Sequence, residues 1–307
     1  MAEAMSGQGI LRDPRWLAAT AGGLMAATLS LWAMRGLPLG FAAFWLAPLP
    51  LFAAGLGFGP GAVVGAAGLA AAIHAALAGT LPMLVFLVAF GIPAAAMVIA
   101  GFRGGRIEPG MPLALLGIWP AIAILGTAFA LSGMPGGLEG ALRIAVENGV
   151  ARMGGNPATF PVDEMVRIMP AALGFWAAVS LSVNGAAAQS ALARSGYALA
   201  PTPRWSEVRL PSWYPALPGA GAAAWLVFGG VADVATLAVL LALLVPVFLQ
   251  GVAAVHRRSA GRPGRSFMLG IFYAGLVILS VPAAIAVTAF GFFEQWGRRS
   301  GPPGGAT

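Results

Sequence analysis

The feature that most constrains this chain is a series of long tracts that carry almost no charged side chains. Interrupted only by His74 and Asp233, these tracts cover residues 36–102, 109–138, 168–193, 210–255 and 266–293. A helix needs about 20 predominantly apolar residues to cross the hydrocarbon core of a bilayer, so each tract is long enough for one to three crossings. The tracts therefore predict a protein that crosses a membrane several times.

Composition narrows the class of protein further. Apolar residues make up 59% of the chain and charged residues 9%, whereas soluble domains are roughly a quarter charged. The apolar runs are unbroken, while strands of a membrane barrel would alternate apolar and polar residues, so we expect an all-α bundle. All 17 basic residues are arginines scattered singly or in pairs, which excludes a nucleic-acid partner bound by a broad basic face.

Breaks at proline, glycine and arginine divide the tracts into about nine transmembrane spans, with a range of eight to ten. The predicted spans are 16–34, 39–56, 62–78, 83–101, 112–131, 164–188, 212–229, 234–255 and 267–290. The predicted parts of the chain are a cytoplasmic N-terminus (1–15), a five-span bundle (16–131), an extracytoplasmic amphipathic loop (132–163), a four-span bundle (164–296) and a tail expected to be disordered (297–307).

The placement of arginine predicts how the chain is oriented, because cytoplasmic loops carry an excess of basic residues. With the N-terminus in the cytoplasm, the cytoplasmic segments hold eleven arginines and the outer segments hold six. We therefore expect a multi-pass protein of the bacterial inner membrane with a cytoplasmic N-terminus. Nine spans would put Arg298 and Arg299 outside, against the same rule, so the side of the C-terminus stays open.

The longest polar connection, residues 132–163, has the pattern of a short amphipathic helix. Glu139, Arg143 and Glu147 alternate in charge every fourth residue, opposite a face of apolar residues. This helix either joins two spans along the surface or forms a lid over an outward-facing pocket.

Two further loops carry positive charge: loop 190–211, which also bears tryptophan, and the arginine-rich loop 257–265. Each loop is either an anchor among lipid headgroups or a docking surface for a cytoplasmic partner.

Polar side chains inside the apolar tracts are the candidate ligand-binding residues, because burying them in hydrocarbon is costly. These candidates are His74, Asn184, Asp233 and Gln250. Each also has a structural interpretation: His74 as a packing residue, Asp233 as a charge at a helix N-terminus, and the two amides as hydrogen-bonding groups between helices.

Small residues recur at four-residue spacing in the first span. Ala18, Gly22 and Ala26 would let another helix approach closely. The neighbouring helix is either one from the same chain or one from a membrane partner subunit.

Catalytic signatures are absent from the sequence. Without lysine there is no GxxxxGK phosphate-binding loop, and neither HExxH nor GxSxG occurs. Two distant histidines without cysteine do not form the usual zinc site. A serine hydrolase built on Ser132 and a histidine would need a hydrogen-bonded pair and oxyanion donors, which no pattern here indicates. We expect no enzymatic activity, no cofactor and no metal.

Four short blocks carry a resemblance that covers most of the chain. They are LPLGFAAFWLAPLPLFAAGLGFGPGAVVG (37–65), RLPSW (209–213), FLQGVAAVHRR (248–258) and FGFFEQWGRR (290–299). In their order these blocks resemble the YybS-like family of bacterial membrane proteins, whose function is largely uncharacterised. That family often has an acidic residue near the position of Glu294. It often has asparagine near the position of Asp233, and because this chain differs there, no role is transferred to Asp233.

The YybS-like family in turn is similar to the substrate-binding S-components of energy-coupling-factor vitamin transporters. The resemblance implies a six-helix core enclosing a small ligand, with additional C-terminal helices. It also implies that Ala18, Gly22 and Ala26 face a partner subunit and that loop 132–163 is the lid.

The leading hypothesis is therefore a membrane protein that binds or moves a small or amphiphilic ligand without chemistry, in a lipid bilayer. The alternative is a non-transporting scaffold or assembly factor for cell-envelope proteins. A cavity touching His74 or Asn184 would favour the first, and a solid bundle with these side chains facing neighbouring helices would favour the second.

Overall fold

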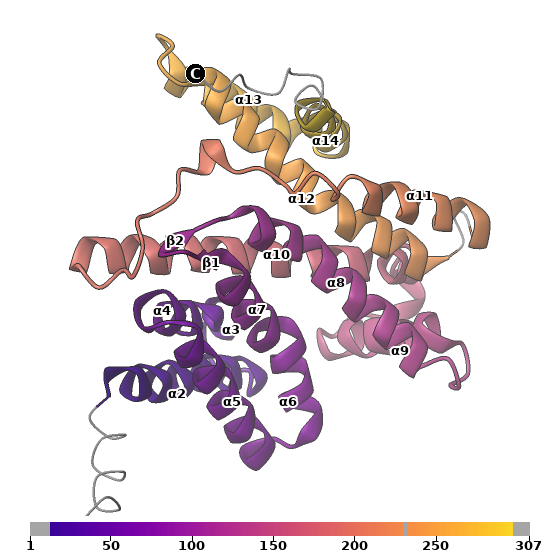
Figure 1. Ribbon diagram of the computed structural model, residues 1–307. Helices are drawn as coiled ribbons and strands as arrows, with labels where there is room; N and C mark the ends of the chain where they lie inside the picture. Colours follow the sequence, from indigo (N-terminus) through magenta and orange to yellow (C-terminus); the bar gives the residue numbers. More distant parts are fainter. Residues whose placement is uncertain (1–12, 230–232, 297–307) are drawn as a thin grey trace, which may run out of the picture. The chain divides into compact units, whose positions relative to one another are not determined.

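The computed structural model describes residues 13–229 and 233–296 (Figure 1). Most of the predicted N-terminus 1–15, the predicted tail 297–307 and the Arg298–Arg299 pair lie outside the described residues. About 80% of these described residues are helical, and among them there is one antiparallel pair of two-residue strands, β1 (Phe102–Arg103) and β2 (Arg106–Ile107). The expected all-α class is confirmed.

The helices follow one another along the chain with short connections. They are α2 (Pro14–Met34), α3 (Gly40–Leu46), α4 (Pro48–Phe58), α5 (Pro60–Leu77), α6 (Thr80–Phe86), the π-helix η1 (Leu87–Gly91), α7 (Ile92–Gly101), α8 (Gly110–Ala130), α9 (Gly137–Arg152), the 3₁₀-helix η2 (Pro157–Thr159), α10 (Val162–Ser195), the 3₁₀-helix η3 (Trp205–Glu207), α11 (Ala216–Phe228), α12 (Val234–Ser259), α13 (Arg265–Leu279) and α14 (Val281–Trp296).

Seven helical segments in the described part of the chain are long and apolar enough to cross a membrane. They are Pro14–Met34, Gly40–Phe58, Pro60–Leu77, Thr80–Gly101, Gly110–Ala130, Val162–Ser195 and Val234–Ser259. Each of them coincides with one of the nine predicted spans. The protein is therefore a multi-pass membrane protein, although the count of nine is not confirmed.

The two remaining predicted spans are shorter helices. The predicted span 212–229 contains only α11, whose 13 residues extend about 20 Å and do not cover a hydrocarbon core of about 30 Å. The predicted span 267–290 is divided at Ser280, which adopts a positive φ of 41° between α13 and α14. Pro282 follows two residues later and has no amide hydrogen to donate to the preceding turn, which favours the break at this place.

Prolines also shape two of the seven long segments. Segment Gly40–Phe58 consists of α3 and α4, which meet at Ala47, before Pro48. Segment Thr80–Gly101 changes from α to π winding at η1, just before Pro93. Proline lacks the amide hydrogen of an interior helical residue, so it interrupts the hydrogen-bond ladder at both places.

The chain forms two compact units. The N-terminal unit comprises Met1–Leu115 and Trp176–Pro203, and the C-terminal unit comprises Leu116–Phe175 and Arg204–Thr307. In the N-terminal unit α2 packs closely along α5. A Cβ atom placed on Gly23 would lie 2.7 Å from the carbonyl oxygen of Ala66, so only glycine allows the two backbones to come this close.

The C-terminal unit is arranged around α12, which contacts α11, η3, α13 and α14. Here too glycine permits a close crossing, because a Cβ atom on Gly251 or Gly291 would collide with a carbonyl oxygen of the facing helix.

The predicted helix in loop 132–163 is present as α9. Its Val146 and Val150 pack against Val162 and Val166, and its charged residues face outward.

Candidate functional site

His74 lies on α5 and is fully buried in the N-terminal unit. Its Nδ1 is 2.7 Å from the carbonyl oxygen of Ala70, and its Nε2 is 2.8 Å from the hydroxyl of Ser30 on α2. A carbonyl oxygen only accepts, so Nδ1 carries the proton, and in the neutral ring Nε2 accepts from Ser30. The ring also stacks on Phe86, with the centroids 4.6 Å apart. His74 therefore connects α2, α5 and α6.

The serine–histidine pair in this structure differs from the one considered in the sequence. Ser132 donates to the carbonyl of Phe129, 2.8 Å away, whereas Ser30 is the serine beside His74. Ser30 and His74 both have an exposed fraction of 0%, so no substrate carbonyl reaches this hydroxyl.

Asn184 lies on α10 in the N-terminal unit and also connects two helices. Its Nδ2 donates to the carbonyl oxygens of Trp45 and Ser180, at 2.7 and 2.8 Å. The Ser180 hydroxyl donates to the same Trp45 carbonyl at 2.7 Å. Trp45 lies next to the break between α3 and α4 that Pro48 imposes. Polar side chains of α10 therefore bind the backbone where this span is interrupted, as irregular membrane helices require.

Asp233 caps the N-terminus of α12. Its carboxylate oxygens accept from the backbone amides of Ala235 and Thr236 at 3.0 and 3.1 Å. Asp is among the preferred N-cap residues because its oxygens satisfy amides that have no partner in the first helical turn. This is the structural interpretation that the sequence left open.

Gln250 is buried in the C-terminal unit at the crossing of α12 and α14. Its Oε1 accepts from the backbone amide of Leu210 at 2.8 Å, and its Nε2 donates to the carbonyl of Gly291 and to Oε1 of Gln295. Gln295 in turn donates to the carbonyls of Leu210 and Pro211. The two glutamines therefore hold the non-helical segment that precedes α11.

Several members of these networks were not among the predicted site residues. Ser30, Ser180 and Gln295 are partners of the predicted polar residues, and the fully buried Tyr214 donates from its hydroxyl to the carbonyl of Leu243 at 3.0 Å. For Tyr214 one signal was available. It stands between Pro211 and Pro215, and helix-breaking prolines in an apolar tract leave backbone groups that need side-chain partners.

An ion cluster around one buried carboxylate lies at the C-terminal end of α12. The carboxylate of Glu294 on α14 pairs with both Arg257 and Arg258, at 2.5 Å each, and only 8% of the Glu294 side chain is exposed. Arg257 also donates to the carbonyl of Ser206 at 3.2 Å, and the guanidinium of Arg258 lies 4.9 Å from the centre of the Phe290 ring. The last turn of α14 therefore lies beside the end of α12.

The predicted partner face on α2 is occupied within the N-terminal unit. Gly22 and Ala26 are buried, and Ala18 is half-buried. A Cβ atom on Gly22 would lie 2.9 Å from the carbonyl oxygen of Pro50 on α4. These contacts support packing against helices of the same chain.

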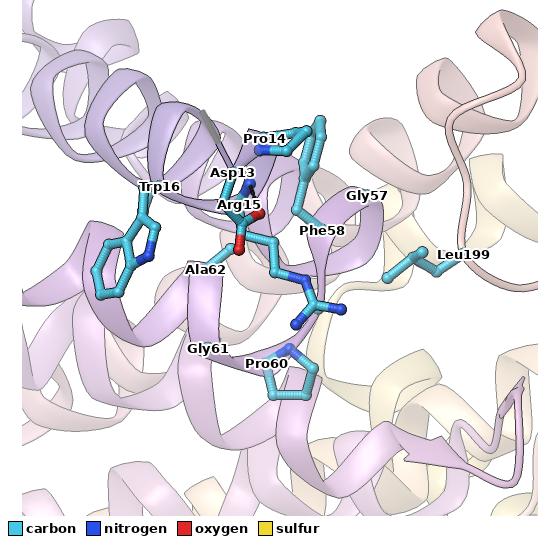
Figure 2. A pocket seen from close by; sticks show the side chains of 12 residues that line it. Asp13, Pro14, Arg15, Trp16, Gly57, Phe58, Pro60, Gly61, Ala62 and Leu199 are labelled. Atoms are coloured by element: carbon cyan, nitrogen blue, oxygen red, sulfur yellow. Dashed lines mark hydrogen bonds between the residues drawn. The ribbon is translucent and has the colours of Figure 1, made fainter. Parts of the chain in front are cut away.

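A cavity of about 710 Å³ lies in the N-terminal unit where α2 begins and α4 turns into α5 (Figure 2). Its lining is Asp13, Pro14, Arg15, Trp16, Ala19, Gly57, Phe58, Gly59, Pro60, Gly61, Ala62 and Leu199. Figure 2 shows the side chain of Arg15 reaching from α2 toward Pro60. Neither His74 nor Asn184 lines this cavity.

The turn between α4 and α5 shapes one wall of this cavity. Gly59 adopts a φ of 98°, a conformation that favours glycine, and it provides no side-chain cap for α5. A Cβ atom on Gly61 would meet no other atom within 4 Å, so the first turn of α5 is open on the side of the cavity. Asp13 caps α2 instead, accepting from the backbone amide of Arg15 at 2.9 Å.

No family model, curated protein or solved structure matches the chain. The likeness to the YybS-like family and to S-components is therefore still a prediction based on short motifs. The interpretation of the site rests on its own geometry.

Proposed function

We propose that the protein is a multi-pass protein of the bacterial inner membrane that binds an anionic amphiphile, without chemistry, in the cavity where α2 begins. The observation that carries this proposal is the lining of the cavity, which is apolar except for Asp13 and the Arg15 side chain that reaches across it. A volume of about 710 Å³ lies within the range of ligand pockets, about 300–1,000 Å³.

The charges at the cavity favour an acidic headgroup. The Asp13 carboxylate accepts from a backbone amide of α2, while the Arg15 guanidinium stays charged at any physiological pH and matches phosphate or carboxylate. The uncapped first turn of α5 adds the positive end of a helix dipole. Trp16, Phe58 and Leu199 offer an apolar wall for the rest of the ligand.

The contacts of the C-terminal unit support eight crossings. Residues on α11 and just before it pair with α12 in antiparallel order: Leu210 with Gln250, Tyr214 with Leu243, and Gly221 with Leu240. We infer that residues 206–228 return across the membrane beside α12, non-helical in their first part. Non-helical backbone is tolerated at membrane depth when side chains satisfy it, as the buried glutamines and Tyr214 do here.

In this arrangement α13 and α14 do not cross. α13 begins six residues after the end of α12, and Glu294 near the end of α14 pairs with Arg257 and Arg258 at that same end of α12. Eight crossings then put the last turn of α14 on the cytoplasmic side if the N-terminus is cytoplasmic. Most arginines of the described residues also fall on that side, as the positive-inside rule requires.

The second candidate function is a non-transporting scaffold. It is favoured by one specific observation: His74, Asn184 and Gln250 bind neighbouring elements, and each is at most 3% exposed. Under this interpretation the cavity beside Arg15 binds no ligand in particular.

Filling the cavity tests the proposal. In Gly61→Trp the indole would enter the cavity, whereas Gly68→Trp, two turns further along α5 and equally open, would not. The probes are lysophosphatidylglycerol and lysophosphatidylcholine, added to the protein in a nonionic detergent while thermal unfolding is followed. A ligand at 100 times its dissociation constant stabilises the folded state by about 2.7 kcal/mol.

We expect the anionic probe to raise the melting temperature of the native protein and of Gly68→Trp, but not that of Gly61→Trp. Arg15→Gln should weaken the effect, with Arg35→Gln at the opposite end of α2 as its control. If neither probe stabilises the native protein, or if Gly61→Trp responds like Gly68→Trp, the scaffold is the better interpretation.

A further inference from the structure

The connection between α12 and α13 concentrates positive charge in the C-terminal unit. Arg257, Arg258, Arg262 and Arg265 occur within nine residues without an acidic residue between them. Glu294 pairs with the first two. Arg262 and Arg265 are exposed and pair with no carboxylate among the described residues. The connection therefore holds two arginines that are available to an anion.

The backbone of this connection also favours an anion. Gly261 and Gly264 both have positive φ, at 73° and 74°, and fold the chain sharply between the two helices. Gly264 is the N-cap of α13 and supplies no side chain for the first amides of that helix. Open amides and the helix dipole attract negative charge at the same end of α13 that carries Arg265.

A small cavity of about 150 Å³ lies beside the connection. Its lining is Val255, Arg258, Ser259, Arg262, Met268, Leu269 and Phe290. Of the two arginines in this lining, Arg258 is paired with Glu294, so Arg262 is the one that stands against the apolar wall without a carboxylate partner in the described part of the chain. Arg265 lies just outside the lining, at the start of α13. Guanidinium groups bind phosphate oxygens in pairs of parallel hydrogen bonds, and the apolar wall fits the glycerol and first methylenes of a lipid.

The helix that follows identifies the source of the phosphate. No residue of α13 is buried, and its large apolar side chains are among the most exposed of the described residues, with Phe267 at 74% and Ile278 at 78%. Although α13 does not cross the membrane in the proposed arrangement, side chains of this kind favour the hydrocarbon beside the headgroups. A soluble anion would use the arginines alone, whereas a phospholipid uses the arginines and the apolar surface beside them.

We propose that the connection between α12 and α13 binds the headgroup of an acidic phospholipid, with Arg262 and Arg265 contacting the phosphate. Basic pockets at the cytoplasmic ends of membrane helices are suited to such headgroups. The proposal is independent of the Arg15 cavity, because the two sites share no residue and belong to different units.

Native mass spectrometry of the full-length protein in detergent tests this proposal, with phosphatidylglycerol and phosphatidylcholine of matched chains as probes. The test variant is Arg262→Gln/Arg265→Gln, in which neither altered side chain packs in the core. The matched control is Arg103→Gln/Arg106→Gln, two exposed arginines of the β1–β2 turn with the same change in net charge. Equal melting temperatures of the two variants verify that both are folded.

We expect the native protein and the control variant to retain phosphatidylglycerol in preference to phosphatidylcholine. Each arginine near an anionic lipid contributes roughly a fivefold factor in affinity, so the test variant should bind phosphatidylglycerol about 25-fold more weakly. Equal retention of phosphatidylglycerol by both variants would overturn the proposal. Complete displacement of the lipid by millimolar inorganic phosphate would overturn it in favour of a soluble anion.

The same measurement on Gly61→Trp separates the two proposals. Gly61→Trp removes any phosphatidylglycerol that the Arg15 cavity holds, so the lipid retained by this variant reports on the α12–α13 connection. Adding Arg262→Gln/Arg265→Gln to Gly61→Trp should remove that remaining lipid, whichever way the lysolipid experiment turns out.

Discussion

The two units of this protein hold their helices together by different means. In the N-terminal unit α2 and α5 meet through glycine and alanine, and His74 and Asn184 add a few polar contacts. In the C-terminal unit a network of glutamine, tyrosine, glutamate and arginine side chains surrounds α12. The difference follows the regularity of the backbone. Regular helices satisfy their own amides and can pack through small residues, whereas a non-helical segment needs side-chain partners.

The largest expected effect is at the ion cluster of the C-terminal unit. In Glu294→Leu the buried carboxylate is lost and Arg257 and Arg258 remain side by side. Water can solvate the two arginines that remain, which are 31% and 56% exposed, so we expect a loss of about 2–3 kcal/mol from the charge-assisted hydrogen bonds. The free energy of unfolding in mixed micelles measures it. Glu139→Leu, on the exposed face of α9, is the control and should change this value by less than about 0.5 kcal/mol.

A pair of identical substitutions compares the two units directly. Gln250→Leu leaves the Leu210 amide and the Gly291 carbonyl without this side-chain partner, and should cost about 2 kcal/mol. Gln189→Leu in the N-terminal unit removes a hydrogen bond of 2.8 Å to the carbonyl of Ala200 and a long one of 3.4 Å to the hydroxyl of Thr202. It also removes a buried oxygen that has no hydrogen-bond partner among the described residues.

We therefore expect Gln189→Leu to cost clearly less than Gln250→Leu when the midpoints of denaturant unfolding are compared. Equal losses would mean that the polar network of the C-terminal unit is no more important than a single amide contact.

The packing of the N-terminal unit is tested by a pair of glycines. Gly23→Ala puts a methyl group 2.7 Å from the Ala66 carbonyl and should destabilise the protein by about 1–2 kcal/mol. Gly68 lies on α5, and a Cβ atom there would meet no other atom within 4 Å. Gly68→Ala should therefore stabilise the protein by about 0.5–1 kcal/mol, because alanine favours helices. Thermal unfolding of both variants gives the sign. The same sign for both would contradict close backbone packing of α2 on α5.

The smallest expected effect is at the hydrogen bond between α2 and α5. Ser30→Ala removes the hydroxyl beside Nε2 of His74 and should cost about 1 kcal/mol. Thr28→Ala, on the exposed face of α2, is the control, since its hydroxyl bonds only within its own helix. A loss at Ser30 as large as that at Glu294 would show that the N-terminal unit depends on polar contacts as well.

Much of the fold was predictable because length and hydropathy dictate membrane helices locally. All seven long segments and α9 follow from uncharged tracts and from residues at helical spacing. The two predicted spans that are not confirmed are 212–229, which contains only the short helix α11, and 267–290, which is divided between α13 and α14. Apolar composition alone does not reveal that Pro211, Pro215 or Pro282 interrupts a helix, or where the chain goes afterwards.

The candidate residues were identified with less success than the helices. The cost of burying polar groups singled out His74, Asn184, Asp233 and Gln250, and each of them makes side-chain hydrogen bonds in the structure. This cost does not tell whether a polar side chain binds a ligand or a backbone group of a neighbouring segment. In the structure the hydrogen bonds of these side chains are to segments of the same chain. The Arg15 cavity was not predicted, because its lining comes from residues far apart in the sequence.

By itself the sequence determined that this protein is a membrane protein, because the preference of an apolar helix for hydrocarbon depends only on local composition. It also determined where several helices begin and end, through proline, glycine and the cap residue Asp233. Which polar groups meet, which glycines allow backbones to touch and where a cavity is left open were decided only by the tertiary structure. These properties depend on distances between residues that are separated along the chain, and composition and spacing do not specify those distances.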